Sequence, residues 1–174
     1  MTPRVLLLRG INVGGRGKLP MAELRAAIEA AGGSDPKTYI QTGNAVFRGS
    51  VGEVALSDEI EARAGFRPGV MLLDAHAFAA IRQGNPFPDA TDDAKALHVG
   101  FLAAPPACTQ ADLDAARGAE ERALLTSAAV YLHTPKHLSG SALAPRLERL
   151  VGVPLTLRNW RTVEAIAALL DEAS

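Results

Sequence analysis

Residues 4–20 read RVLLLRGINVGGRGKLP. The apolar run at 4–8 is short and stops at Arg9, which predicts a buried β-strand. A loop over residues 10–18 follows, with four glycines in nine positions. Pro20 then predicts the start of a helix, because the first helical turn does not need the N–H group that proline lacks. The stretch therefore predicts a strand, a glycine-rich loop and a helix.

The patterns that follow complete one series of elements. They predict two strands around the turn Thr42-Gly43-Asn44, a helix capped by Ser57, a strand at 70–73, and a helix that Asp74 caps and Gly84 ends. The first half of the chain thus has the order β-α-β-β-α-β-α.

The second half of the chain repeats this order. The predicted elements are a strand at 97–102, a helix capped by Thr109, a hairpin of 122–125 and 130–133, a helix from Ser141, a strand at 155–157 and a last helix capped by Thr162. We expect an α+β fold of two ferredoxin-like (βαββαβ) units in tandem, each followed by an extra helix. The turn-rich segment 85–89 separates the predicted domains, residues 1–86 and 87–174.

Composition excludes some classes of protein. The hydrophobic content of 48% and the charged content of 21% are those of a globular protein. The net charge of −1 gives no long-range attraction for a polyanion. Cys108 has no second cysteine to pair with, and no apolar run suits a signal peptide or a membrane span. We therefore expect a cytoplasmic protein with no membrane contact.

The glycine-rich loop is the first predicted binding motif. Its glycines allow positive φ, and backbone N–H groups beside cations suit an anion. The loop is not a phosphate loop of the Walker type, because Asn12 and Leu19 stand where that motif needs Gly and Ser or Thr. In the alternative interpretation the glycines only make a tight turn. The predicted ligand-binding residues here are Arg9, Gly10, Asn12, Gly14, Gly15 and Lys18.

Two further polar motifs stand later in the chain. The segment 39–44 contributes the candidates Tyr39, Gln41, Thr42 and Asn44, although turn formation explains it equally well. The segment 158–160 contributes the candidates Arg158, Asn159 and Trp160. We favour a packing role for Trp160 over stacking on a ligand, because tryptophan is mostly buried. Whether the three motifs share one pocket is not predicted.

None of the three motifs contains Asp or Glu, and no nucleophile or metal-ligand cluster stands out. We predict no catalytic residue, no metal and no cofactor. The leading hypothesis is a binding protein for a small anionic ligand, phosphate- or nucleotide-like, at the loop 9–18. Single-stranded nucleic-acid binding across the sheet, through Tyr39 and Phe47, and an enzyme of unrecognised type stay open. The oligomeric state is not predicted.

Four segments resemble one protein family. They are Leu7 to Gly15, Thr38 to Asn44, Asn85-Pro86-Phe87 and Thr156 to Trp160. Together they are similar to the bacterial family called Domain of Unknown Function 1697. The resemblance implies a duplicated ferredoxin-like architecture. It implies no activity, because no function is established for that family.

Overall fold

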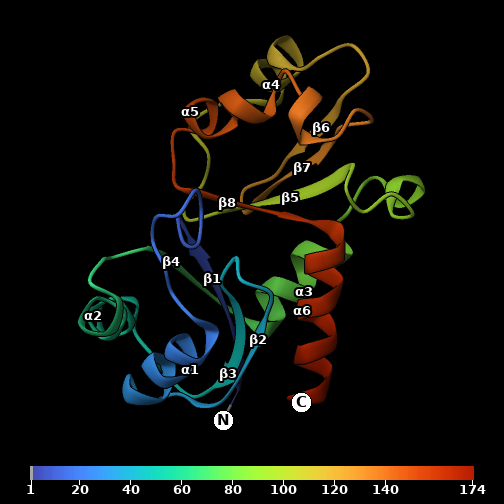
Figure 1. The fold of residues 1–174 in the computed structure, drawn as a ribbon. Coiled ribbons are helices and arrows are strands. Elements are labelled where there is room, and N and C mark those ends of the chain that lie inside the picture. The colour runs from blue at the N-terminus through green and yellow to red at the C-terminus, as the bar shows by residue number, and fades with distance from the viewer. Residues whose placement is uncertain (1) are drawn as a thin grey trace. The chain divides into compact units, whose positions relative to one another are not determined.

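The computed structural model describes residues 2–174 (Figure 1). These residues form six α-helices and two four-stranded antiparallel sheets, which confirms the predicted α+β class. The elements of the first half are β1 (Pro3–Arg9), α1 (Met21–Ala30), β2 (Ser34–Tyr39), β3 (Asn44–Arg48), α2 (Glu53–Ala64), β4 (Gly69–Asp74) and α3 (Ala75–Gln83). Those of the second half are β5 (Leu97–Leu102), α4 (Gln110–Ala116), β6 (Arg122–Leu125), β7 (Ala129–His133), α5 (Leu147–Val151), β8 (Leu155–Asn159) and α6 (Trp160–Glu172).

The chain forms two compact units. The first comprises residues 1–80 and 165–174, and the second comprises residues 81–164. The division therefore falls inside α3, and residues 165–174 join the first unit. An ion pair of 2.8 Å between Lys37 Nζ and Glu172 Oε2 links β2 to the end of α6. Arg48 on β3 also donates a hydrogen bond to the carbonyl of Ala173.

The first sheet has the strand order β2-β3-β1-β4, with β1 antiparallel to both of its neighbours. Alternate residues of a strand face opposite sides of the sheet. Leu6 and Leu8 pack into one cluster with Leu24 of α1 and Leu56 of α2, the two helices seen on one side of the sheet in Figure 1. Residues 5–8 are all fully buried, so both faces of β1 are covered.

The second sheet repeats this arrangement with the order β6-β7-β5-β8. Its core cluster joins Val130 and Leu132 of β7 to Leu113 of α4 and Leu147 of α5. The predicted bounds of β5 and β6 match the observed ones. Thr109 caps α4 in a capping box with Asp112, as predicted.

The segment between the predicted domains belongs to the second unit. Asn85 Oδ1 accepts a hydrogen bond of 3.0 Å from the N–H of Phe87. The Arg122 guanidinium then lies 4.6 Å from the centre of the Phe87 ring and donates bonds of 3.2 and 2.8 Å to the Asp89 carboxylate. Cation–π contact and ion pair together hold this segment on β6.

Two predicted helix caps and one predicted helix start are wrong. The cap of α2 is Gly52, not Ser57, and the earlier start places the buried Leu56 inside the helix. Ser141 opens no long helix, since Pro145 lies in a 3-10 turn and restricts α5 to 147–151.

Asn159, not Thr162, caps α6. Its Oδ1 accepts a bond of 2.9 Å from the Thr162 N–H, and asparagine is the better cap of the two. The strand predicted directly before the turn Thr42-Gly43-Asn44 ends at Tyr39, because Ile40 has a φ of +49° and leaves the extended conformation.

His98 on β5 makes the second unit sensitive to acid. Its side chain is buried, and Nδ1 has no hydrogen-bond partner among the described residues. Burial, helped by the nearby His137, lowers the pKa of His98 from 6.5 to about 4. The unfolded chain therefore binds a proton between these pH values and the folded chain does not, so stability falls as pH falls.

We expect the free energy of unfolding to decrease by up to about 3 kcal/mol through this window because of His98 alone. Denaturant unfolding of the wild type and of His98→Phe between pH 7.5 and pH 4 measures this difference. The variant keeps the acid sensitivity of the carboxylates and loses that of His98. Parallel stability curves for the two proteins would contradict the assignment.

Candidate functional site

The glycine-rich loop folds into a small hairpin. The N–H of Asn12 donates to the carbonyl of Gly17 at 2.8 Å, and Val13 and Arg16 exchange bonds of 3.2 and 2.9 Å. Gly14 and Gly15 form the turn with φ values of +57° and +75°. Two central residues with positive φ are typical of a type I′ hairpin turn. The loop is therefore a projecting hairpin between β1 and α1.

The side chain of Asn12 joins this hairpin to the second motif. Its Nδ2 donates to the carbonyl of Gln41 at 2.7 Å and to that of Leu19 at 3.0 Å. Its Oδ1 accepts a bond of 2.9 Å from the Leu19 N–H. The first two sequence motifs thus lie together, a proximity that the sequence left open. The Asn12 side chain uses its hydrogen bonds on the backbone of Leu19 and Gln41.

The turn of the second motif rests on β1. The carbonyl of Gly43 accepts a bond of 2.8 Å from the Leu8 N–H. A Cβ at position 43 would lie 2.6 Å from the Leu8 Cβ, so only glycine allows this approach. Asn44 is buried, and its Nδ2 donates to the Tyr39 carbonyl at 3.0 Å and to Thr42 Oγ1 at 2.9 Å.

We call residues 10–18 and 39–44 the two-loop surface. Arg16, Lys18 and Gln41 are exposed on it, and among the described residues their side chains have no ion pair or hydrogen bond. The backbone N–H groups of Gly14 and Gly15 also have no partner within residues 2–174. No Asp or Glu stands in either segment. The surface offers donors and positive charge and no carboxylate.

The third motif belongs to the second unit. Arg158 lies on β8 opposite Val99, and burial lowers the pKa of its guanidinium to about 10. One of its nitrogens donates to the Leu157 carbonyl at 3.0 Å. Asn159 caps α6, and Trp160, its first residue, is buried. Asn159 and Trp160 thus have structural roles at the start of this helix.

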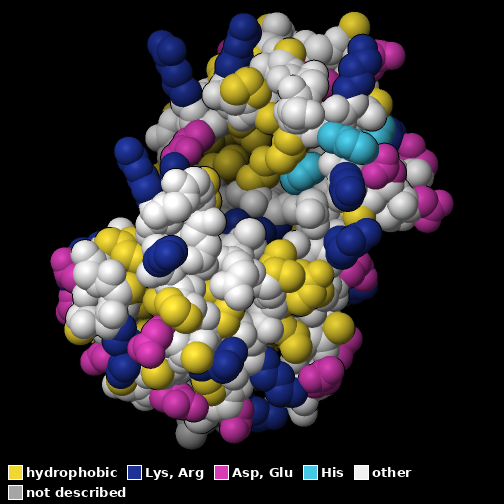
Figure 2. All heavy atoms as spheres, viewed as in Figure 1, with side chains coloured by type: hydrophobic (Ala, Val, Ile, Leu, Met, Phe, Trp, Pro, Cys, Tyr) yellow, Lys and Arg dark blue, Asp and Glu magenta, His cyan; other side chains and the backbone are white. Residues whose placement is uncertain are grey.

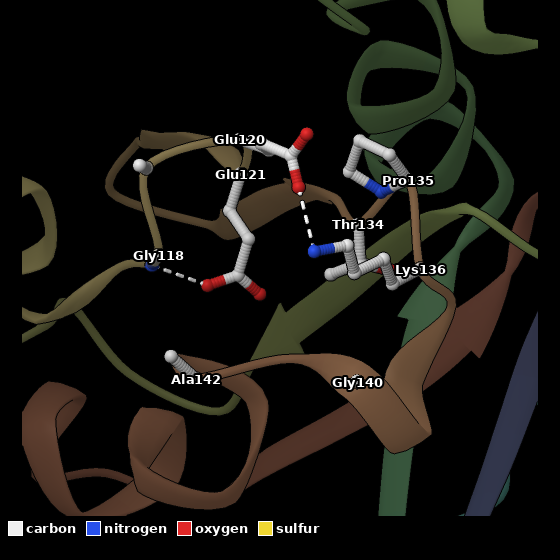
Figure 3. A pocket seen from close by; sticks show the side chains of 9 residues that line it. Gly118, Glu120, Glu121, Thr134, Pro135, Lys136, Gly140 and Ala142 are labelled. Atoms are coloured by element: carbon white, nitrogen blue, oxygen red, sulfur yellow. Dashed lines mark hydrogen bonds and ion pairs between the residues drawn. The ribbon is translucent and has the colours of Figure 1, made fainter.

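The second unit also contains a pocket of about 210 Å³ (Figure 3). Glu121 lies at its wall and is buried. Its Oε2 accepts bonds of 2.5 Å from the Gly118 N–H and 3.2 Å from the Leu143 N–H, and its Oε1 accepts one from Ser141 Oγ. Burial alone would raise the pKa of Glu121, but these hydrogen bonds lower it overall. The Glu121 carboxylate therefore joins the loop at Gly118 to the segment from Ser141 to Leu143.

Charges are dispersed over the rest of the surface. Figure 2 shows Lys and Arg side chains scattered over the face it draws, with acidic side chains between them. His137 Nε2 lies 3.3 Å from Asp93 Oδ2, and His133 Nδ1 accepts a bond of 3.2 Å from Arg122 Nε. No three His, Cys, Asp or Glu side chains among residues 2–174 gather as metal ligands. No helix in that range has the length and apolar character needed to span a bilayer.

Comparison with known proteins agrees with the motifs. The sequence profile of a family described as "Protein of unknown function (DUF1697)" matches residues 1–131. The chain belongs to this family. No curated protein matches the sequence.

One similar solved structure is that of a conserved bacterial protein, SP0830, from Streptococcus pneumoniae. The two proteins are 23% identical and superpose with a TM-score of 0.69. The match covers 97% of this chain and 98% of that one. At this level of identity the likeness establishes a shared fold and nothing about function.

Sequence reasoning missed part of the two-loop surface. The sequence marks Arg16 as a cation of the loop beside Arg9 and Lys18, but Arg16 was not among the predicted ligand-binding residues. The prediction also missed the exposed side chains of Val13 and Ile40. The sequence does not indicate the exposure of either residue, because apolar side chains are expected to be buried. It also does not indicate the positive φ of Ile40.

We expect Asn12 to stabilise the two-loop surface strongly. Asn12→Ala removes three hydrogen bonds and leaves alanine at a φ of +51°, so the free energy of unfolding should fall by about 2–4 kcal/mol. Asn12→Gly removes the same bonds but suits the backbone, and should be about 1 kcal/mol less harmful. Denaturant unfolding of both variants measures the two contributions. An Asn12→Gly protein as stable as the wild type would show that the bonds contribute nothing.

Proposed function

We propose that the two-loop surface binds a small anionic ligand, phosphate- or nucleotide-like. Lys18 and Arg16 supply positive charge, together with Arg9 at the end of β1. The N–H groups of Gly14 and Gly15 supply hydrogen bonds, and Gln41 supplies a neutral donor from the second motif. Asn12 contributes indirectly, by holding the two segments together.

The observation that carries this proposal is a set of exposed donors, gathered at one junction, that have no partner among the described residues. Arg16 and Lys18 are exposed cations without an ion-pair partner among residues 2–174, in a chain whose other cations frequently have one. A phosphate would gain charge-assisted hydrogen bonds from them.

The second unit provides an internal comparison. Its sheet has the same strand order, but its connection at 103–109 contains no glycine, no cation and no residue with positive φ among those described. Its hairpin turn at 126–128 is closed by Thr126 Oγ1, which accepts bonds from Ala128 and Ala129. A connection between strand and helix thus needs neither the glycines nor the cations of the first unit. Their presence at 10–18 supports a role beyond turn formation.

The absence of carboxylates supports binding over catalysis. A general base or a metal-assisted hydrolysis needs a carboxylate or histidine beside the reacting group. Neither the segment 9–19 nor the segment 39–44 contains one. We therefore propose that the surface holds its ligand and transfers no proton.

We further propose that each unit is a ferredoxin-like βαββαβ fold. The strand orders β2-β3-β1-β4 and β6-β7-β5-β8 support this assignment. Binding of nucleic acid on the first sheet has less support, because Phe47, which such binding would need on the surface, is fully buried. A ligand role for Arg158, Asn159 and Trp160 and a cytoplasmic location stay predictions.

Titration calorimetry with inorganic phosphate, pyrophosphate and AMP tests the proposed function. We expect binding that weakens about tenfold in Lys18→Ala and in Arg16→Ala, because each loses one charge-assisted hydrogen bond. Raising the salt concentration should weaken binding as well. Both variants should keep the thermal stability of the wild type, since neither side chain has a partner within the described chain.

Lys95→Ala is the matched control. It removes one exposed lysine from the second unit and should leave the affinity unchanged. The proposal fails if none of the three anions binds. It also fails if Lys95→Ala weakens binding as much as Lys18→Ala, because the attraction would then come from overall charge.

A further inference from the structure

The two-loop surface also presents two large apolar side chains to solvent. Val13 is 67% exposed and Ile40 is 48% exposed. In the part of the chain that the structure describes, the one other exposed large hydrophobic side chain is Val54 on α2. Val13 follows Asn12 and Ile40 precedes Gln41, the two residues joined by the 2.7 Å hydrogen bond. Both apolar side chains therefore stand at the junction of the two loops.

Ile40 is held in a conformation that isoleucine rarely adopts. Its φ of +49° crowds a β-branched side chain against the backbone. The side chain is half exposed, so its own burial does not compensate for the strain. The flanking carbonyls are fixed instead: Asn44 donates to that of Tyr39, and Asn12 to that of Gln41. Glycine or asparagine would fit position 40 with less strain.

A strained backbone position whose side chain is exposed on the proposed binding surface indicates a role in recognition. Two side chains cover far less area than the roughly 1,600 Å² of a standard protein–protein interface. They do match one small organic group. Arg16 is paired with Val13 across the hairpin, so a cation and an exposed apolar side chain stand on the same loop. One molecule with an anionic group and an apolar group could contact both.

We infer that the ligand is a phosphate ester whose organic part is apolar or aromatic, and that this part packs on Ile40 and Val13. The inference rests on the proposed function and names its ligand class. Lys18 and Arg16 bind the phosphate. The apolar pair distinguishes an ester from inorganic phosphate.

Calorimetry with inorganic phosphate and phenyl phosphate tests the inference in four proteins: the wild type, Ile40→Asn, Val13→Thr and the control Val54→Thr. The wild type should bind phenyl phosphate at least about tenfold more tightly than inorganic phosphate. Ile40→Asn should remove most of this preference and leave the affinity for inorganic phosphate unchanged. Val13→Thr, which keeps the shape of the side chain, should reduce the preference, and Val54→Thr should not.

A stability measurement separates recognition from folding. Asparagine tolerates positive φ, so we expect Ile40→Asn to raise Tm by about 2–4 °C while it weakens binding of the ester. Equal affinity of the wild type for the two anions would overturn this inference and leave the proposed function standing. A preference that survives Ile40→Asn, or equal weakening of both anions, would also overturn it. Failure of both anions to bind would overturn this inference, and the proposed function would fail with it only if pyrophosphate and AMP also do not bind.

Discussion

The side-chain amide of Asn12 fixes the arrangement on which the candidate site depends. This planar group binds the backbone of Leu19, where the hairpin returns toward α1. It also binds the backbone of Gln41, which lies 29 residues after Asn12. Asn12 stands shortly after β1, a strand that is buried on both faces. Gly10 and Asn12, both with positive φ, turn the chain after β1, and the Asn12 side chain then binds the loop that results. Asn12 thus helps to set the direction of the loop and holds it beside the neighbouring turn.

Side-chain hydrogen bonds to the backbone recur wherever the chain leaves its sheets. Asn44 closes the turn between β2 and β3, and Asn85 closes the segment before β5. Glu121 and Thr126 do the same in the second unit. Buried backbone groups outside the sheets need such partners, because an unpaired N–H or carbonyl costs about 1–3 kcal/mol.

Much of the fold could be predicted because its signals are local. The apolar run at 97–102 and the Thr109 cap depend on adjacent residues, and both were predicted with their observed positions. The caps of α2 and α6 were not, because each helix start offers more than one candidate residue within a few positions. Propensity ranks such candidates, but it does not by itself fix the residue at which a helix begins.

The candidate site was predictable as a set of residues and not as an arrangement. Glycines, cations and amides mark the loops 9–18 and 39–44 in the sequence. The bond from Asn12 to Gln41 depends on the pairing of β1 with β3, which brings two separate loops to one end of a sheet. The positive φ of Ile40 follows from that contact and from Asn44, so no propensity scale would assign it.

The composition of the first unit has a consequence for biosynthesis. Residues 165–174 complete this unit, and Glu172 and Ala173 bind its strands β2 and β3. A ribosome releases those residues only after it has made the whole of the second unit. The first unit therefore cannot complete its fold until residues 165–174 have been synthesised. The second unit has all of its residues before then and is free to fold. A truncation or bulky fusion near residue 172 would disturb the unit that begins at the opposite end of the sequence.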